Sequence, residues 1–529
     1  MAVNIIGSGL AGLSAAWTLA KENIPCNLIS RHPSERAQSV LAEGGINAAL
    51  NTMGEADTVE LHAMETLKAG AFLADPNAVM NLTSGAPEVV EELKNLGVPF
   101  HQKDGKLILR SFGGQKKKRT AYAKSSTGKA LMTALIDAVR QYEVQGLVTR
   151  YPHHEFLSLI LDTEDGSICR GVSIKDSYTH RTYKFFGPVI CCSGGLNGFF
   201  PEMTTGTTAN QGDAASELFF QGVAFSNLEM IQYHPTTIGI CGKRCLISEA
   251  ARGEGGRLFA DRHGEKWYFM EEKYPELGNL MPRDVVSREE YFILHDPSDP
   301  LEVYLDMTEL SGESWNTKLS DLRLELIEYT GVDPAQVPVS VEPGIHYFMG
   351  GIHVDKQHHT NVKNLYAAGE CCSQYHGANR LGGNSLLGAV FGGKMAAKTV
   401  LQEYSPAENR VQEADLPIPE KESVTVIHDV SGILQSGLGI VRDQTHLDAA
   451  LSALFSYAGD HSLNPAEQKR VYLAEAMLRS AAFRKESRGA HYRIDYPDQE
   501  ESYRKIQLAL LESGRVRILQ EEIPMRRDT

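Results

Sequence analysis

The sequence has no cysteines spaced as metal or cluster ligands. None of its eight Cys residues forms a C-x-x-C pair, and the adjacent pairs Cys191-Cys192 and Cys371-Cys372 lie inside apolar runs. We therefore predict buried thiols in a reducing compartment, and no disulfide framework, metal site or iron–sulfur cluster.

The sequence also lacks long apolar runs and a basic surplus. No run of 18 apolar residues and no leader peptide is found, so we expect a cytoplasmic protein without a membrane span of its own. The net charge of −15 argues against nucleic acid and anionic membranes as partners, but local Arg and His residues can still bind anionic small molecules. The 529 residues, without repeats, are too many for one core and predict two or three domains.

A glycine fingerprint begins almost at the first residue. An apolar run over 3–6 predicts a buried strand, Gly7-x-Gly9-x-x-Gly12 follows, and an Ala/Leu-rich run over 13–21 predicts a helix. Gly7 allows the tight turn, Gly9 lets the backbone approach a pyrophosphate, and Gly12 lets the helix pack on the strand. With Leu10 and Ala11 at the start of the helix, this pattern predicts a dinucleotide site.

The next strand lacks the acidic residue that usually ends it. We predict this strand over 25–30, where Ser30 occupies the position that commonly binds a ribose through a carboxylate. Glu35 and Arg36 are possible substitutes, and the sequence does not decide between them. A loop with Ser39, Gly44 and Gly45 follows, and its paired glycines again allow close approach of the backbone.

The rest of the chain predicts three parts. Helices are expected over 58–73, 87–96, 128–139 and 384–403, and strands over 156–172, 182–192 and 364–370. We predict an α/β fold with a Rossmann-like FAD-binding domain over 1–224 and 341–405, an inserted α+β capping domain over 225–340, and a helical domain over 406–529. A polar linker with Pro406, Pro417 and Pro419 marks the last boundary. The basic run 116–119 predicts a solvated turn.

An ordered set of motifs resembles the flavoprotein subunit of succinate dehydrogenase and fumarate reductase. Besides the first glycine loop, the matches cover residues 42–48, 112–114, 234–236, 248–256, 282–284, 346–351 and 376–386, and the likeness extends to about residue 497. The resemblance implies FAD as the cofactor and a C4 dicarboxylate, fumarate or succinate, as the substrate. L-aspartate oxidases share much of this pattern.

The resemblance also assigns the substrate site. It implies that Arg380 and His346 hold one carboxylate, that His234 and Ser248 hold the other, and that Phe112 packs beside flavin and substrate. Arg283 would donate a proton to the substrate carbon, with Glu249 and Arg252 relaying protons to it. Arg and His suit this task because a guanidinium fork matches a carboxylate and His adds a charge-assisted donor. Taken singly, Arg283 could be a structural ion pair and His234 a core histidine.

Further positions are implied for the flavin. Glu370 would hold a ribose or ribityl hydroxyl, and Asp213 would contact the flavin or its glycine loop. Asn384, Ser385 and Leu386 would present a helix N-terminus to the pyrimidine edge of the flavin. Most family members carry a His that binds the flavin covalently, but Gln38 stands at that position, so we expect non-covalent FAD and a preference for fumarate reduction.

Two functional alternatives remain open at this stage. The first is a fumarate reductase or succinate dehydrogenase subunit that delivers electrons through an iron–sulfur subunit, with the segment 484–493 against that partner and a membrane anchor beyond it. The second is a self-sufficient L-aspartate oxidase, which the length and Gln38 also suit. A non-enzymatic flavin-binding subunit is disfavoured because the full cationic set is present. We further expect the capping domain to close over a bound dianion, bringing Arg283 to Arg380.

Overall fold

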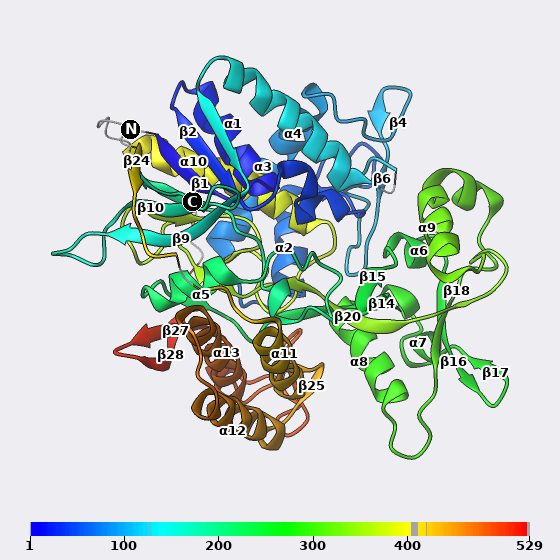
Figure 1. Cartoon of the computed structure of the whole chain (residues 1–529). Coiled ribbons are helices and arrows are strands. Elements are labelled where there is room, and N and C mark those ends of the chain that lie inside the picture. The colour runs from blue at the N-terminus through cyan, green and yellow to red at the C-terminus, as the bar shows by residue number, and fades with distance from the viewer. Residues whose placement is uncertain (1, 125, 404–410, 419, 526–529) are drawn as a thin grey trace.

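A five-stranded parallel sheet forms the centre of the cofactor domain (Figure 1). The computed structural model describes residues 2–124, 126–403, 411–418 and 420–525. The sheet has the order β22 (Leu365–Ala367), β12 (Val189–Cys191), β1 (Val3–Ile6), β2 (Cys26–Ser30) and β8 (Val148–Pro152). Strands from both halves of the sequence therefore share this sheet, and the central strand β1 is fully buried.

Helices cover one face of this sheet. Helix α1 (Leu10–Lys21) packs against α10 (Asn384–Glu403) and α4 (Thr127–Val144), and α3 (Pro76–Asn95) packs on α10. Helix α2 (Val59–Ala69) continues this layer. The prediction that a helix starts at Pro87 is wrong, because α3 begins at Pro76 under an Asp75 cap and Pro87 lies inside it.

An antiparallel sheet lies beside the parallel one. It consists of β9 (His154–Leu161), β10 (Cys169–Asp176), β11 (Thr182–Phe186) and β24 (Val411–Ala414), in the order β24-β11-β10-β9. The segment predicted as a linker thus contributes the edge strand β24, because its residues pair with β11. Of the prolines in that linker, Pro406 and Pro419 lie outside the described residues. Helix α5 (Asp213–Phe220) packs on β9.

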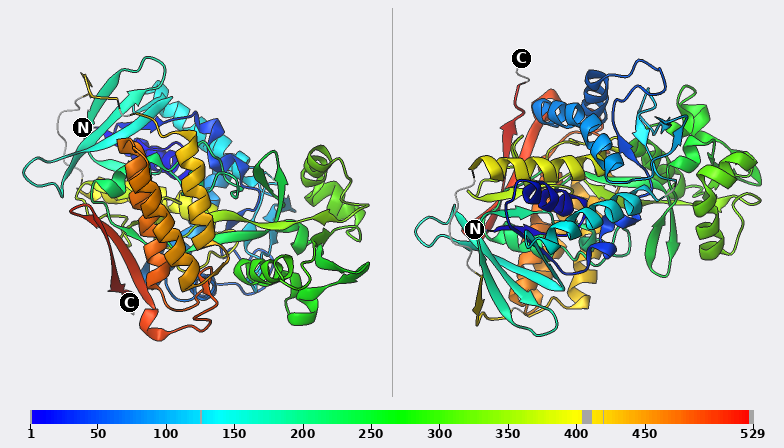
Figure 2. Two further views of the ribbon diagram at one scale, coloured as in Figure 1. Left: turned by 60° about the horizontal axis from the view of Figure 1, so that its bottom comes forward. Right: turned by 90° about the horizontal axis from the view of Figure 1, so that it is seen from above.

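A separate lobe extends from the cofactor domain on two strands. The antiparallel pair β14 (Ile231–Ile240) and β20 (Glu342–Phe348) leads into it, with β15 (Lys243–Leu246) beside β14. The lobe contains β16 (Arg257–Arg262), β17 (Glu265–Trp267), β18 (Val303–Asp306), β19 (Val339–Ser340), α6 (Ala250–Gly253), α7 (Phe269–Lys273), α8 (Arg283–Leu294) and α9 (Ser320–Thr330). Its own apolar core and its position on one side of the molecule fit the predicted capping lobe (Figures 1 and 2).

The C-terminal part combines three helices with a hairpin. The helices are α11 (Val424–Leu438), α12 (Gln444–Asp460) and α13 (Pro465–Phe483), and a capping box of Asn464 and Glu467 starts α13. The last residues were predicted to be mostly helical, which is wrong for β27 (Lys505–Glu512) and β28 (Arg515–Glu522). These strands extend a sheet with β13 (Phe225–Ser226), β21 (Gly351–His353) and β23 (Cys372–Ser373), and the outer strand β28 is mostly exposed.

Two further expectations concern side chains. The four cysteines of the two adjacent pairs are buried free thiols, as predicted. The solvated-turn prediction is wrong for Arg119, because its guanidinium is buried and contacts the carboxylates of Asp57 at 2.8 Å and Glu65 at 2.9 Å. A buried cation is tolerated only with such partners.

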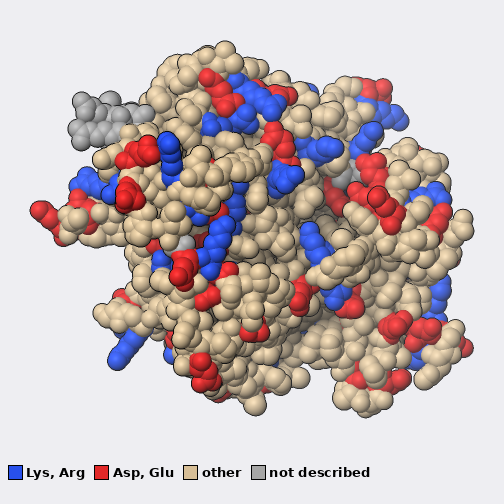
Figure 3. All heavy atoms as spheres, viewed as in Figure 1, with Lys and Arg blue, Asp and Glu red and all other residues tan. Residues whose placement is uncertain are grey.

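The distribution of charged side chains and the apolar character of the helices agree with the composition. On the face shown in Figure 3, acidic and basic side chains are interspersed. Among the helices of the described chain, none combines the length and apolar character needed to cross a bilayer.

Candidate active site and cofactor cleft

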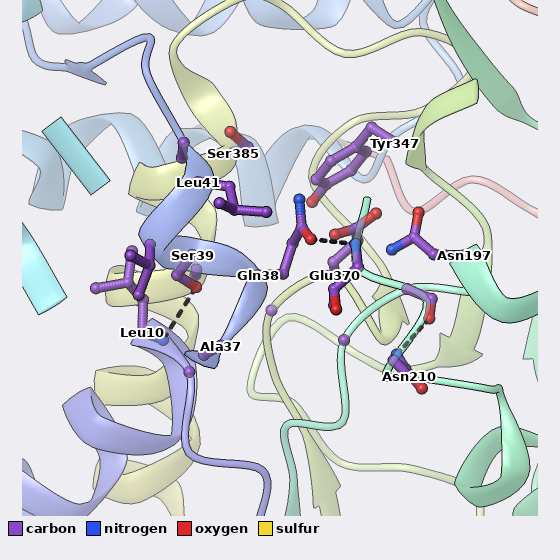
Figure 4. Close-up of a pocket in the computed structure, with 18 of the residues that line it drawn as sticks. Leu10, Ala37, Gln38, Ser39, Leu41, Asn197, Asn210, Tyr347, Glu370 and Ser385 are labelled. Carbon is purple, nitrogen blue, oxygen red and sulfur yellow. Dashed lines mark hydrogen bonds between the residues drawn. The ribbon is translucent and has the colours of Figure 1, made fainter. Parts of the chain in front are cut away.

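A cavity of about 770 Å³ runs from the first glycine loop to the root of the capping lobe. Its wall is built by segments far apart in the sequence, including residues 6–11, 29–45, 192–214, 368–370 and 383–389. Figure 4 shows Leu10 and Ser39 on one side of it and Glu370, Tyr347 and Asn197 on the other. The volume suits a cofactor-sized ligand.

The glycine loop is shaped for close backbone packing. A Cβ on Gly7, whose φ is +105°, would lie 2.1 Å from the carbonyl oxygen of Cys192, and one on Gly12 would lie 1.9 Å from that of Gly7. Gly9, Leu10 and Ala11 line the cavity, whereas Gly12 does not and serves the packing of α1 on β1. A buried turn that leads into the N-terminus of a twelve-residue helix fits a pyrophosphate.

The end of β2 carries a cation where dinucleotide folds usually carry an acid. Ser30 lines the cavity and donates a hydrogen bond to the carbonyl of His32 at 2.7 Å. The next residue, Arg31, is held by the carboxylate of Asp213, which also lines the cavity at the start of α5. Asp213 therefore lies beside the end of β2. Of the two residues considered as substitutes for the missing acid, Arg36 lines the cavity, and Glu35 is turned to the surface toward Arg140.

The short helical turn Gln38–Leu41 lies against the glycine loop. The hydroxyl of Ser39 accepts a hydrogen bond from the backbone N–H of Leu10 at 3.3 Å, and the Gln38 side-chain oxygen accepts one from the N–H of Thr207 (Figure 4). Both residues line the cavity, as do Gly44 and Gly45 of the following loop. Gln38 offers an amide here, so it can hydrogen bond to a flavin but cannot form the His link.

The opposite wall is formed by Glu370 and the start of α10. Glu370 accepts a hydrogen bond from the N–H of Phe348 at 3.1 Å, and burial raises the pKa of its carboxyl to about 7. A buried acid with a raised pKa can donate or accept a hydrogen bond to a hydroxyl. Ser385 and Leu386 line the cavity at the N-terminus of α10. Asn384 lies behind them, where its side-chain oxygen contacts the ring of His62 at 3.0 Å.

At the other end of the cavity, two arginines converge on one glutamine. Gln232 Oε1 accepts hydrogen bonds from Arg283 at 3.2 Å and from Arg380 at 3.0 Å. The Glu249 carboxylate binds Arg283 through two nitrogens, at 2.7 and 2.6 Å. Arg283 comes from α8 of the lobe and Arg380 from the loop before α10, so the structure brings together the two cations that the sequence places about a hundred residues apart.

The charges of this cluster fix the state of Glu249. Burial alone would raise the pKa of its carboxyl, but the charges of Arg283 and Arg252 outweigh burial and lower that pKa to about 2. Glu249 also accepts a hydrogen bond from the N–H of Gly113 at 2.6 Å. Burial, followed by the charge of Arg283, lowers the pKa of Arg380 to about 9. Glu249 is therefore a carboxylate at neutral pH.

Arg252 lies behind this cluster and does not line the cavity. One of its terminal nitrogens donates to the carbonyl of Asn279 at 2.6 Å, whereas its Nε and Nη2 are buried without a hydrogen-bond partner in the described chain. Burial lowers the pKa of Arg252, and the charge of Glu249 opposes that shift. Arg252 is thus electrostatically connected to Glu249 but remote from the cavity.

The two histidines of this cluster are neutral imidazoles. Burial, and then the charge of Arg283, lowers the pKa of both His234 and His346 well below the usual value. The N–H of Thr236 donates to His234 Nδ1 at 3.3 Å, so the neutral ring carries its proton on Nε2. The hydroxyl of Thr205 contacts His346 Nδ1 at 2.8 Å. The rings lie 5.2 Å apart and both line the cavity.

Phe112 and Ser248 complete this end of the cavity. The Phe112 ring would lie 3.5 Å from a Cβ on Gly44, so the second glycine loop passes directly over it. The hydroxyl of Ser248 accepts a weak hydrogen bond from the N–H of Ala250 at 3.4 Å. A cavity with an aromatic wall, two cations and two neutral imidazoles can bind a small dianion beside a planar ring system.

Sequence reasoning missed several residues of this site. Gln232 is the most important, because it joins the two arginines and also donates to Asn379 at 2.7 Å. Its position two residues before His234 on one strand was an available signal, since alternate strand residues share a face. Thr205, Arg31 and Tyr347 were also missed, and no local pattern distinguishes them from other polar residues.

Comparison with known proteins agrees with this geometry. Residues 3–386 match the family model described as an FAD binding domain, and residues 467–527 match the model described as fumarate reductase flavoprotein C-term. The glycine loop, the carboxyl of Glu370 and the start of α10 lie within the first of these ranges and fit FAD.

Individual relatives cover nearly the whole chain. The chain is 35% identical to a succinate dehydrogenase flavoprotein subunit of Bacillus subtilis, over 94% of this chain and 91% of that protein. It is 33% identical to an L-aspartate oxidase of Nostoc, over 94% and 90%. It is also similar to the FrdA chain of an E. coli quinol fumarate reductase, with a TM-score of 0.87, 26% identity, and coverage of 100% of this chain and 97% of that chain.

Proposed function

Because this chain belongs to the succinate dehydrogenase and fumarate reductase family of FAD-dependent flavoproteins, we propose that it interconverts fumarate and succinate and favours fumarate reduction. The observation that carries the proposal is the meeting of Arg283 and Arg380 at Gln232, on the wall of a cavity that also holds the glycine loop. Guanidinium groups at this end suit a C4 dianion, because they form strong hydrogen bonds to carboxylates.

FAD would be held without a covalent bond. Reduced FAD, when bound, supplies a hydride through N5 of its ring to one face of the alkene. The helix N-termini of α1 and α10, Ser39, Gln38 and Glu370 would hold the cofactor, and Ser30, Arg31 and Asp213 lie at the ribose end of the cleft. Acid precipitation of the purified protein tests the attachment: released flavin in the supernatant supports the proposal, and flavin retained in the pellet refutes it.

The substrate would be held by its two carboxylates. Arg380 and His346 would bind one, and His234 and Ser248 the other, with Phe112 closing the wall beside the cofactor. The neutral imidazoles donate single hydrogen bonds, so the guanidinium groups supply the positive charge. Carboxylates fixed in this way orient the double bond and polarise it toward attack.

Arg283 would donate the proton to the substrate carbon. Its bidentate contact with the ionised Glu249 fixes the guanidinium at the cavity wall and provides a group that can return a proton. Arg252 would pass protons to Glu249 from the interior of the lobe. An arginine acid requires a site without bulk water and a relay that reprotonates it at once, because a guanidinium in water stays charged.

The direction of the reaction would follow from Gln38. The family resemblance links covalent attachment at this position to a higher flavin potential, which helps succinate oxidation, and Gln38 cannot form the bond. The test is an anaerobic assay of the isolated chain with reduced viologen and fumarate, run beside succinate with a dye. Faster fumarate reduction than succinate oxidation is expected; the reverse order would refute the assigned direction, and no turnover in either would refute the function.

A second candidate function is aspartate oxidation. It is favoured by the 33% identity to an L-aspartate oxidase and by Gln38. A self-sufficient chain that oxidises aspartate with dioxygen and yields iminoaspartate would establish this alternative, whereas dependence on an external electron donor supports fumarate reduction.

Electrons would reach the chain from an iron–sulfur subunit and, through it, from a membrane anchor at the inner face of the cell membrane. No group of three or more metal-binding side chains is found in the described chain. Most charges of the segment predicted to face the partner are turned inward, as shown by Arg484, which binds Glu229 at 2.7 Å in the interior, whereas Lys485 is exposed. Ile494 and Tyr496 are exposed hydrophobic residues beside this segment that a partner could cover. Co-purification with an iron–sulfur protein tests this assignment.

The capping lobe would close the site around the substrate. Arg283 belongs to the lobe and Arg380 to the cofactor domain, so both meet only when the lobe is docked as it is here. Closure would exclude water from the proton donor. A fumarate-dependent decrease in hydrogen exchange at the β14–β20 arms would support this motion.

A further inference from the structure

A buried carboxyl group lies behind the proton relay and has no partner. Glu290 is fully buried on α8, and neither of its carboxyl oxygens has a hydrogen-bond partner in the described chain. Burying a polar group without a hydrogen-bond partner costs free energy, so an unpaired group in a native protein needs a specific explanation. Glu290 therefore requires an explanation beyond packing.

The position of Glu290 connects it to Arg283. The two residues are seven apart on α8, with Ser287 between them, so all three lie on the buried face of one helix. Ser287 anchors this face to β14 through a hydrogen bond to the carbonyl of Tyr233 at 3.3 Å. The same helix thus presents the proposed proton donor at its first turn and an unpaired carboxyl about two turns further on.

Arg252 is the relay residue whose charge acts on this carboxyl. Its charge acts on Glu290 and that of Glu290 acts on it, yet no ion pair within 4.0 Å joins them in the described chain. Arg252 has two buried nitrogens without partners, Nε and Nη2, on the side not used by Asn279. Arg252 therefore has unpaired donors and Glu290 has unpaired acceptors, both groups are buried, and their charges act on each other.

Burial favours the protonated form of Glu290. Burial raises its pKa well above the usual value, and the charge of Arg252 offsets only part of that effect. The strands β14, β18 and β20 pack against α8, and none of their titratable groups shifts the pKa of Glu290. These groups are Tyr233, His234, Tyr304, Asp306, Glu342, His346 and Tyr347. The pKa of Glu249, in contrast, is lowered to about 2, so the pKa values of the two carboxyls that act on Arg252 are shifted in opposite directions.

We propose that Glu290 is the outer member of the proton relay, which supplies protons to Arg252 for transfer to Glu249 and Arg283. This inference rests on the proposed fumarate reduction. In each turnover Arg283 first protonates the substrate carbon. Glu249 then passes a proton to Arg283, Arg252 passes one to Glu249, and the Glu290 carboxyl passes one to Arg252. No electrons move in the relay. Because Glu290 is fully buried here, its carboxylate regains a proton from water that reaches it when the lobe opens between turnovers.

The test compares Glu290→Gln with Glu289→Gln in the flavin-loaded protein. Gln is nearly isosteric but cannot transfer a carboxyl proton. Glu289 is a matched control because it is the neighbouring glutamate on α8 and its carboxylate is already paired, with Lys273 at 2.5 Å and Tyr274 at 2.8 Å. We expect Glu290→Gln to lower kcat for viologen-driven fumarate reduction about tenfold, below the roughly 100- to 10,000-fold effect of a direct acid. KM should be unchanged and the solvent deuterium isotope effect on kcat should increase. Glu289→Gln should change none of these.

Two further measurements separate the possible failures. Infrared spectroscopy of the unmodified protein should show a protonated carboxyl band that Glu290→Gln removes, whether or not the protein reduces fumarate. Glu290→Asp, which keeps a titratable carboxyl, should recover part of the lost kcat. Wild-type kcat and isotope effect in Glu290→Gln, or equal losses in Glu290→Asp and Glu290→Gln, would overturn the relay role. Absence of fumarate reduction in the wild-type protein would instead refute the proposed function.

Discussion

Gln232 provides the sharpest test of the active site. It is fully buried, and its one side-chain oxygen accepts hydrogen bonds from Arg283 at 3.2 Å and Arg380 at 3.0 Å. Its nitrogen donates to the Asn379 side chain at 2.7 Å and to the carbonyl of Arg380 at 2.9 Å. A single side chain therefore sets the positions of both cations, one from the lobe and one from the cofactor domain.

Replacement of Gln232 by Leu keeps the approximate volume and removes all of these hydrogen bonds. Hydrogen bonds to charged groups contribute about 1.5–3 kcal/mol each. Only the share of this energy that orients the two cations affects the stability of the transition state. We expect a loss of about 2–3 kcal/mol of transition-state stabilisation, or roughly a 30- to 150-fold decrease in kcat/KM for fumarate. The measurement is the anaerobic viologen assay, with flavin content and circular dichroism checked for each variant.

Replacement of Gln232 by Glu should give a different pattern. A carboxylate between the two guanidinium groups satisfies them but cancels charge that would otherwise bind the dianion, so KM should rise more than kcat falls. Gln145→Glu on the exposed end of α4 controls for the change in net charge. If both Gln232 variants keep kcat/KM within about threefold of the wild-type value, the arginines do not depend on this glutamine and the assignment is wrong.

Three other predictions concern the cofactor and the core. Gly12→Ala would place a Cβ 1.9 Å from the carbonyl oxygen of Gly7. We expect the unfolding free energy to fall by about 1–3 kcal/mol, measured by thermal unfolding, and the bound flavin to decrease, measured by absorbance. Unchanged flavin content would contradict the tight turn. Arg119→Met leaves the buried carboxylates of Asp57 and Glu65 unpaired and should cost about 3–5 kcal/mol in urea unfolding, whereas a neutral effect would contradict the buried ion pairs. Glu370 keeps its proton up to about pH 7 in the folded protein but loses it near its ordinary value when unfolded, so stability should fall as pH rises from about 4.5 to 7, by about 3 kcal/mol. Glu370→Gln should flatten that dependence, and an unaltered pH profile would refute the raised pKa.

The elements that are encoded by neighbouring residues could be predicted from the sequence. The strand, the glycine turn and the helix at residues 3–21 are encoded by neighbouring residues, and they form as predicted. The start of α3 was misplaced because Pro87 looked like a helix start, although the Asp75 cap and Pro76 carry the same signal eleven residues earlier. The C-terminal hairpin was missed because its partner strand β13 lies almost three hundred residues away, and no local signal marks that pairing.

The active site likewise contains residues that could be predicted from the sequence and residues that could not. The resemblance supplied Arg283, Glu249 and Arg380, and the structure places them together. It did not supply Gln232, whose role exists only because two distant arginines converge on it. Nor could the sequence show that Arg119 is buried in a basic run, since its carboxylate partners come from a different part of the chain. It also could not show that burial keeps His234 and His346 neutral.

The split construction of the cofactor cleft bears on how the protein is made. The cradle needs the first glycine turn, Glu370 and the beginning of α10, so more than two thirds of the polypeptide must leave the ribosome before those parts can meet. The sheet beside the C-terminal helices is finished even later, when the last hairpin pairs with β13. Cofactor loading must therefore follow the near-completion of synthesis, and a ribosome-stalled chain that ends before residue 365 should emerge without flavin.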